Sequence, residues 1–127
     1  MKERHVPSLL YFEVTADDLD RAAQFYRDVF GWAVGPAEGT EDYYVMETGS
    51  EEQPGVTGGV VPRFDAYEST INTFDVADVD AFAQRIAEAG GEVLAPKIAI
   101  PGVGFVQYCQ DTEGNTFGIM QLDESAS

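Results

Sequence analysis

Two carboxylates stand in similar sequence surroundings, and they are the first candidates for chemistry. Glu13 lies in the triplet Phe12-Glu13-Val14, and Asp75 lies in the triplet Phe74-Asp75-Val76, about sixty residues further along the chain. Two facing carboxylates could act as a general acid and a general base, or could hold a divalent metal. The alternative is that both side chains lie at strand ends in water. Glu13 and Asp75 are therefore the candidate catalytic residues.

Two other reactive side chains have simpler interpretations. His5 is the only histidine and comes before the first expected strand, so we expect an exposed terminal residue rather than a ligand. Cys109 is the only cysteine, which excludes an internal disulfide. It alternates with Tyr108 in an expected strand and has no histidine nearby in sequence. We therefore expect a buried, inert thiol.

The glycine-rich stretches do not match a phosphate-binding loop. Residues 55–59 and 102–104 are rich in glycine but contain no lysine, and neither stretch opens a helical pattern. Glycine at these places is more typical of close sheet contacts or of space left for a cavity.

The elements that would position these residues occur twice in the same order. In the first half, alternating apolar residues predict a strand over 8–14, and helical spacing predicts a helix over 18–30 that ends at Gly31. Return strands are expected at 32–34, 43–48 and 57–62, with Gly39 and Pro54-Gly55 in the turns.

The second half repeats this pattern. A strand is expected over 70–76 and a helix over 79–89, which Gly90-Gly91 should terminate. Further strands are expected over 92–96, 105–110 and 115–122, separated by 100–104 and 111–114. Residues 64–69 connect the halves, and residues 123–127 are expected to form a loose polar tail.

Repetition predicts an α+β fold in which two tandem βαβββ modules form curved mixed sheets around a cleft. One domain of 1–127 is expected, with module 1 at about 8–63 and module 2 at about 70–122. The cleft could form within one chain or between two chains. Both arrangements place Tyr11 and Glu13 opposite Thr73 and Asp75.

Composition limits the partners. Twenty-three acidic residues against seven basic ones give a formal charge of -16, which should repel nucleic acid and anionic membrane surfaces. The simplest explanation is a solvated surface suited to high salt, as in a halophile; the alternative is attraction of a cationic ligand. A single cysteine and the lack of a long apolar run favour a cytoplasmic protein.

The chain resembles the vicinal oxygen chelate superfamily, which includes glyoxalase I, extradiol dioxygenases, and bleomycin and fosfomycin resistance proteins. The resemblance extends from Leu9 to Gln121 and is closest to proteins related to lactoylglutathione lyase. It is carried by Tyr11-Phe12-Glu13-Val14, by residues 21–32 with the phrase Phe-Tyr-Arg-Asp-Val-Phe-Gly-Trp, and by 100–104 followed by 111–118. Fold membership does not define the activity, because one fold hosts several chemistries.

The resemblance implies a divalent metal held by the first and last strand of each half. The corresponding positions fall near Leu9 or Tyr11, Gly59, Ile71 or Thr73, and Gly118, none of which is His, Glu or Asp. Gly59 and Gly118 offer a bare backbone where the metal enzymes present glutamate. We therefore expect no metal ligands and no cofactor.

The sequence thus predicts metal-independent binding of a small, partly aromatic molecule in the cleft. The predicted ligand-binding residues are Tyr11, Thr57, Gly59, Thr73, Gln107, Thr116 and Gly118, with aromatic side chains from Trp32, Tyr43, Tyr44, Phe64, Tyr67, Phe105 and Tyr108 available to line the cleft. The alternatives are a metal-dependent lyase, isomerase or dioxygenase that uses Glu13, Asp75 or Glu47 as displaced ligands, or a dimer with no ligand. A homodimer is expected, because open sheets leave apolar edges to cover.

Overall fold

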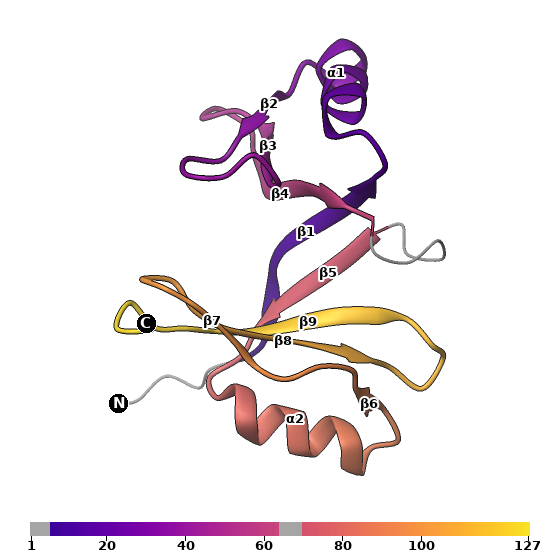
Figure 1. The fold of residues 1–127 in the computed structure, drawn as a ribbon, viewed down its shortest axis with the longest axis vertical. Coiled ribbons are helices and arrows are strands. Elements are labelled where there is room, and N and C mark those ends of the chain that lie inside the picture. Colours follow the sequence, from indigo (N-terminus) through magenta and orange to yellow (C-terminus); the bar gives the residue numbers. More distant parts are fainter. Residues whose placement is uncertain (1–5, 64–69) are drawn as a thin grey trace. The chain divides into compact units, whose positions relative to one another are not determined.

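A computed structural model describes residues 6–63 and 70–127 of the chain (Figure 1). Contacts divide it into two compact units, Tyr11–Ile71 and Asn72–Ser127, and the second also includes the described residues before Tyr11. We refer to β1–β4 with α1 as the N-terminal module, and to β5–β9 with α2 as the C-terminal module. The connector 64–69, with Phe64 and Tyr67, lies outside the described residues, as does His5.

The N-terminal module follows the predicted βαβββ order. Its elements are β1 (Ser8–Ala16), α1 (Leu19–Phe30), β2 (Ala33–Pro36), β3 (Tyr44–Gly49) and β4 (Pro54–Pro62). The strands lie in the order β2-β3-β4-β1. Both pairs that involve β3 are antiparallel, whereas β1 and β4 are parallel, so the sheet is mixed. Pro54 and Gly55, which we expected in a turn, begin β4 instead.

The predicted signals set both ends of α1. Asp18 is the N-cap, and its carboxylate accepts a hydrogen bond of 3.0 Å from the backbone N–H of Arg21. Gly31 ends the helix with a positive φ of 72°, a conformation that costs glycine little, and its N–H donates to the Arg27 carbonyl. The apolar side of α1, with Ala23 fully buried, packs on the sheet in a core that also contains Ala16, Val34, Tyr44, Met46 and Val60.

The C-terminal module contains β5 (Thr70–Asp75), α2 (Val79–Glu88), β6 (Glu92–Val93), β7 (Ile98–Ile100), β8 (Gly104–Gln110) and β9 (Thr116–Leu122). Within it, β5 runs parallel to β9, β9 antiparallel to β8, and both β6 and β7 antiparallel to β8. Asp78 caps α2 by accepting from Ala81 N–H at 3.1 Å. The helix contributes its buried Val79 to a core that also contains Val76, Cys109 and Ile119.

One predicted strand of this module is divided in two. We expected a continuous strand over 92–96, but β6 ends at Val93 and β7 resumes at Ile98 along the same neighbour, β8. Pro96 explains the interruption, because proline has no N–H for the ladder. The carbonyl of Ala95 accepts a hydrogen bond of 2.9 Å from the Gln107 amide instead.

The prediction that residues 123–127 form a loose tail is also wrong. Ala126 is buried, and its carbonyl accepts a hydrogen bond of 2.9 Å from the N–H of Gly102. The N–H of Asp123 donates to the Val103 carbonyl at 2.8 Å. These two bonds tie the last residues to the turn between β7 and β8, so the chain end is part of the module.

The two modules align most closely through their helix caps. Asp18 and Asp78 play the same role, and that frame makes Glu13 equivalent to Thr73, rather than to Asp75 as the sequence triplets indicated. Strand register agrees, because Glu13 pairs with Gly59 and Thr73 pairs with Gly118. Burial agrees as well, since Glu13 and Thr73 are both buried. The two glycines are therefore equivalent, whereas the two carboxylates are not.

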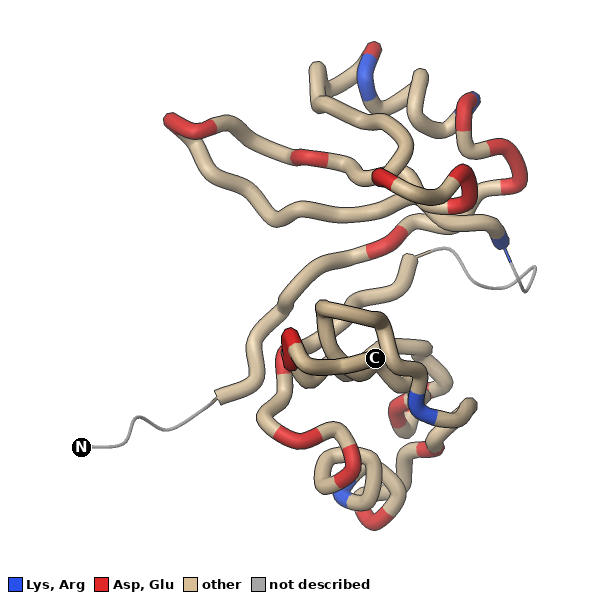
Figure 2. Tube along the Cα trace, turned by 60° about the vertical axis from the view of Figure 1, so that its left-hand side comes forward, with Lys and Arg blue, Asp and Glu red and all other residues tan. Residues whose placement is uncertain are grey.

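Charge is spread along both modules. In Figure 2 the acidic residues occur in loops, helices and strands of each module rather than at one place. Described basic side chains make ion pairs at Arg63–Asp17 (3.0 Å) and Lys97–Asp80 (3.1 Å). None of the helices in the described part of the chain is long and apolar enough to cross a membrane.

Candidate functional site

The side of the N-terminal sheet that faces away from α1 collects most of the predicted polar residues of this module. Phe12 and Val14 of β1 pack toward the helix core, so the alternating residues Tyr11 and Glu13 point to the other side. We call this side the N-terminal face. Register places a row of four residues across it, one from each strand: Glu13, Gly59, Val45 and Gly35. Thr57 and Glu47 are the next pair along β4 and β3.

A tyrosine hydroxyl lies over the bare backbone of Gly59. A Cβ built on Gly59 would be 2.3 Å from the Tyr43 hydroxyl oxygen and 2.5 Å from its ring carbon Cζ. The preceding residue, Gly58, is also covered by an aromatic ring, on the helix side of the sheet. A Cβ on Gly58 would be 2.5 Å from the Phe12 ring. Aromatic rings thus fill the space over both glycines.

Buried polar side chains accompany Tyr43 on this face. Glu13 is only 5% exposed and Thr15 is 7% exposed, although both are polar. Thr15 accepts hydrogen bonds from the Arg63 guanidinium through its hydroxyl, at 3.3 Å, and through its carbonyl, at 3.2 Å. Burying a polar side chain costs free energy unless it is compensated, and Glu13 takes part in an interaction within the protein that offsets this cost.

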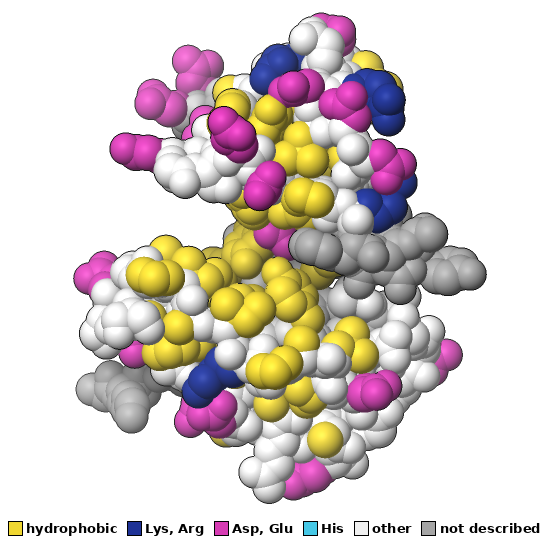
Figure 3. All heavy atoms as spheres, viewed as in Figure 1, with side chains coloured by type: hydrophobic (Ala, Val, Ile, Leu, Met, Phe, Trp, Pro, Cys, Tyr) yellow, Lys and Arg dark blue, Asp and Glu magenta, His cyan; other side chains and the backbone are white. Residues whose placement is uncertain are grey.

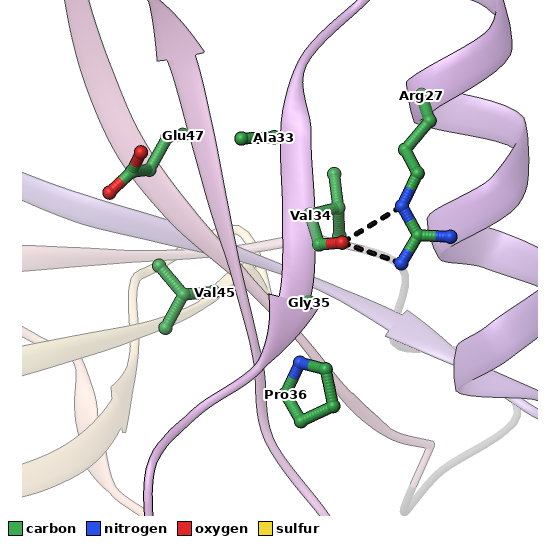
Figure 4. A pocket seen from close by; sticks show the side chains of 7 residues that line it. All are labelled: Arg27, Ala33, Val34, Gly35, Pro36, Val45 and Glu47. Carbon is green, nitrogen blue, oxygen red and sulfur yellow. Dashed lines mark hydrogen bonds between the residues drawn. The ribbon is translucent and has the colours of Figure 1, made fainter.

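A shallow hollow of about 440 Å³ lies at the β2 edge of the same module (Figure 4). Glu47 and Val45 contribute to it from β3, and Arg27 lies on the helix side of β2. The Arg27 guanidinium donates two hydrogen bonds, of 2.9 and 2.5 Å, to the carbonyl of Val34. The other lining residues are Ala33, Gly35 and Pro36.

The corresponding side of the C-terminal sheet carries a row of Thr73, Gly118 and Tyr108, one each from β5, β9 and β8. We call this the C-terminal face. Thr73 is fully buried, and its hydroxyl has no hydrogen-bond partner among the described residues. A Cβ on Gly118 would lie 2.8 Å from that hydroxyl. Asp75 and Thr116 point to the same side by strand alternation.

Apolar side chains flank this polar row. Register puts Ile98 beside Val106 and Val106 beside Met120, all on the side away from α2. Ile98 is 48% exposed and Leu122, further along β9, is 54% exposed. In Figure 3 hydrophobic side chains gather over the strands of this module. The C-terminal face therefore offers an aliphatic surface to an apolar ligand.

Two residues considered in the sequence lie on the helix side instead. Gln107 pairs with Ile119, a core residue under α2, and its amide donates to the Ala95 carbonyl. Cys109 is fully buried in the same core, and burial raises the pKa of its thiol. The structure does not bring Gln107 to the row of Thr73 and Gly118.

The side chains that fill the space beside Gly59 and Gly118 do not fit a metal ion held by carboxylates. The space that a side chain on residue 59 would enter holds the Tyr43 phenol, and the space at residue 118 holds the Thr73 hydroxyl. Within residues 6–63 and 70–127, no group of three or more His, Cys, Asp and Glu side chains is placed to hold a metal ion. A tyrosine or threonine hydroxyl is a poorer divalent-metal ligand than a carboxylate.

The family follows from this fold together with the sequence matches. Residues 8–119 match the Glyoxalase/Bleomycin resistance protein/Dioxygenase superfamily. A glyoxylase-like domain-containing protein of Didymella fabae is 36% identical over 114 residues, which cover 84% of this chain and 88% of the relative. The chain belongs to the Glyoxalase/Bleomycin resistance protein/Dioxygenase superfamily, as the sequence resemblance predicted.

A second relative is longer. A Mycobacterium bovis protein described as "Putative glyoxylase CFP32" is 30% identical over 123 residues, which cover 89% of this chain but only 45% of that protein. The chain thus spans about half the length of this relative.

Solved structures support the fold alone. A methylmalonyl-CoA epimerase in complex with methylmalonyl-CoA has a TM-score of 0.66 and 20% identity, covering 94% of this chain and 96% of the other. The epimerase from Mycobacterium tuberculosis has a TM-score of 0.63 and 16% identity, covering 91% and 87%. Identities this low say nothing about the substrate of this chain.

Sequence patterns located the glycines but not the groups that cover them. Tyr43 was one aromatic residue among several, and nothing in its neighbours indicated that its hydroxyl lies over Gly59. Thr15 was not considered, although strand alternation from Glu13 could have placed it on the same face.

Proposed function

We propose that this protein binds a small, partly aromatic molecule on the side of its sheet that carries no helix, and that binding requires no metal. The observation that carries the proposal is the filling of both glycine positions by hydroxyl-bearing side chains, Tyr43 over Gly59 and Thr73 beside Gly118. Both glycine positions are therefore filled by groups that suit a divalent metal ion poorly. The exposed Ile98 and Leu122 add apolar contact area.

Charge argues for a neutral or cationic ligand. The epimerase relative binds methylmalonyl-CoA, whose phosphates carry several negative charges. This chain has a formal charge of -16, and Arg63 and Lys97 are engaged in ion pairs. A phosphate-rich ligand would therefore be repelled at moderate salt, because charges closer than the Debye length of about 10 Å still interact.

The test is a thermal-shift and calorimetric comparison of neutral aromatics, cationic aromatics and free coenzyme A, at low and high salt, with elemental analysis of the purified protein. A ligand present at 100 times its Kd should stabilise the protein by about 2.7 kcal/mol. We expect binding by uncharged aromatics in protein without stoichiometric metal, unchanged after treatment with a chelator.

A matched pair of variants locates the binding. Ile98→Thr on the C-terminal face should weaken binding, because it removes apolar area from an exposed position. Val29→Thr alters a similarly exposed aliphatic residue on α1 and should leave binding unchanged. Stoichiometric metal whose removal abolishes binding, or equal effects of the two variants, would contradict the proposal.

A further inference from the structure

The hollow at the β2 edge has an apolar floor that belongs to the N-terminal face (Figure 4). Strand register places Ala33 beside Glu47 and Gly35 beside Val45, and paired residues of neighbouring strands point to the same side. We call Ala33, Gly35 and Val45 the floor of the hollow. A Cβ on Gly35 would meet no atom within 4 Å, so the backbone of β2 is uncovered at this point. A flat group could therefore lie directly against the sheet.

Glu47 is the charged residue at one end of this floor. It is exposed, and within residues 6–63 and 70–127 no hydrogen bond or ion pair involves its carboxylate. Val45 lies two residues away on the same side of β3, about 7 Å along the strand. Figure 4 shows both side chains leaving β3 on one side, next to Ala33. An accessible carboxylate thus stands beside accessible apolar surface.

The basic residue that lines the hollow is engaged elsewhere. Arg27 lies on the helix side of β2, where its guanidinium donates two hydrogen bonds, of 2.9 and 2.5 Å, to the Val34 carbonyl. Turning toward Glu47 would break both bonds. A ligand on the floor therefore lies on the same side of the strand as the carboxylate, and the formal charge of -16 attracts cations at longer range.

We infer that the hollow is a subsite for a small organic cation, whose ammonium group pairs with Glu47 while an attached ring or alkyl group lies on the floor. This inference rests on the proposed function and gives the charge of the ligand and the place where it binds. An ammonium group has three N–H donors, and a carboxylate only accepts, so the two groups are complementary. The volume of about 440 Å³ lies within the usual range of small-molecule sites.

Other classes of ligand use the hollow less well. A neutral ring gains the apolar contact but leaves the carboxylate in water, and an anion meets the charge of Glu47 as well as that of the whole chain. The advantage of the cation is modest, because an ion pair at an exposed position contributes little and is screened by salt. We therefore expect a preference of a few-fold that decreases as salt is added.

Three compounds with the same ring and different charge serve as probes: benzylamine, benzyl alcohol and benzoate. Binding is measured by calorimetry and by backbone amide shifts in NMR, at low and high salt. At low salt, wild-type protein should bind benzylamine most tightly, and the amides of Ala33, Gly35 and Val45 should shift. At high salt the affinity for benzylamine should fall toward that for benzyl alcohol.

Two variants separate the charge from the floor. Glu47→Gln should weaken benzylamine about 2- to 5-fold at low salt and leave benzyl alcohol unchanged, because only the ion pair is lost. Gly35→Val places a side chain over the uncovered backbone and should weaken both compounds. The second variant should remain folded, since Gly35 has no positive φ and a β-branched residue suits a strand.

Each variant has a matched control. Glu51→Gln removes the same charge from an exposed position between β3 and β4. Ala99→Val enlarges an exposed residue of β7, in the C-terminal module. Both controls should leave the affinities for benzylamine and benzyl alcohol unchanged, and the melting temperature of every variant checks that it is folded.

The outcomes separate this inference from the proposed function. If benzylamine has no advantage at low salt, or if Glu47→Gln and Glu51→Gln weaken it equally, the cation subsite is wrong. Binding of benzyl alcohol that Ile98→Thr weakens and Gly35→Val does not would then leave the proposed function standing. A preference for benzoate would assign the hollow to an anion near Arg27 and would also overturn the inference. Absence of binding by benzylamine, benzyl alcohol and every other neutral aromatic would overturn both.

Discussion

Three glycines in one small sheet give a direct test of how the aromatic rings are packed. Gly58 faces the Phe12 ring, Gly59 faces the Tyr43 phenol, and Gly35 faces open space. Alanine at each position adds one Cβ, and none of the three has a positive φ. Each substitution should gain about 0.5–1 kcal/mol because alanine loses less backbone entropy than glycine on folding. Differences between the variants therefore report the clash.

The structure predicts the order of the effects. The Phe12 ring is packed against the core beneath α1, so the 2.5 Å approach in Gly58→Ala cannot be relieved by a simple rotation. Strain of about 1–3 kcal/mol is expected, and the entropic gain of about 0.5–1 kcal/mol reduces it to a net loss of up to about 2.5 kcal/mol. Tyr43 is only half-buried, and the clash is with the far end of its side chain, so Gly59→Ala should cost about 1 kcal/mol less. Gly35→Ala should be neutral or slightly stabilising.

Urea denaturation measures these differences. Trp32, the only tryptophan, packs on the core of the N-terminal module and reports its unfolding by fluorescence. A rescue variant sharpens the test: in a Phe12→Leu background, Gly58→Ala should lose most of its cost, with a coupling free energy of at least about 1 kcal/mol. Equal stabilities of Gly58→Ala and Gly35→Ala, or no coupling to Phe12, would refute the packing argument.

Three further outcomes are expected. Removing either helix cap, by Asp18→Ala or Asp78→Ala, should lower the free energy of unfolding by about 0.5–2 kcal/mol in chemical denaturation, because one N-terminal N–H loses its partner; no change would show that the caps are not formed in solution. Hydrogen bonds from the side chain and backbone of Asn115 hold the pKa of Asp111 below its ordinary value of 3.8, so the stability it contributes is complete above that value and is lost as the pH falls through the lower, folded pKa. NMR titration of the carboxyl should show this depression, and Asp111→Ala should abolish that part of the acid dependence. Burial raises the pKa of Cys109, so a thiol-specific reagent should label the native protein far more slowly than the denatured protein, in which one thiol per chain reacts at once.

Sequence alone could predict the elements because their boundary signals are local. Asp18 and Gly31 fix the ends of α1 through contacts within four residues of each end, and both are visible in the sequence. Strand register was not predictable in the same way. The triplets around Glu13 and Asp75 match in residue type. In the strand register, however, the residue of β5 that is equivalent to Glu13 is Thr73, two residues before Asp75. Register depends on pairing between strands far apart in sequence.

The remaining differences between the sequence predictions and the structure arise from contacts between residues far apart in the chain. Ala126 is small and follows several polar residues, so its burial depends on the turn at Gly102, more than twenty residues away. Tyr43 was visible as an aromatic residue, but it lies just before β3, and its position over Gly59 depends on how β3 pairs with β4. The polar side of the site is thus made by long-range pairing, which a local pattern does not contain.

The outer strand of the N-terminal sheet has a consequence for behaviour at high concentration. Among residues 6–63 and 70–127, β2 pairs only with β3, so its other side could template association with a strand from another molecule. The Val34 carbonyl on that side already accepts two hydrogen bonds from Arg27, and the strand ends at Pro36, which cannot donate. We therefore expect Arg27 to hinder the addition of a further strand at this edge, because an incoming strand would have to displace its guanidinium from the Val34 carbonyl.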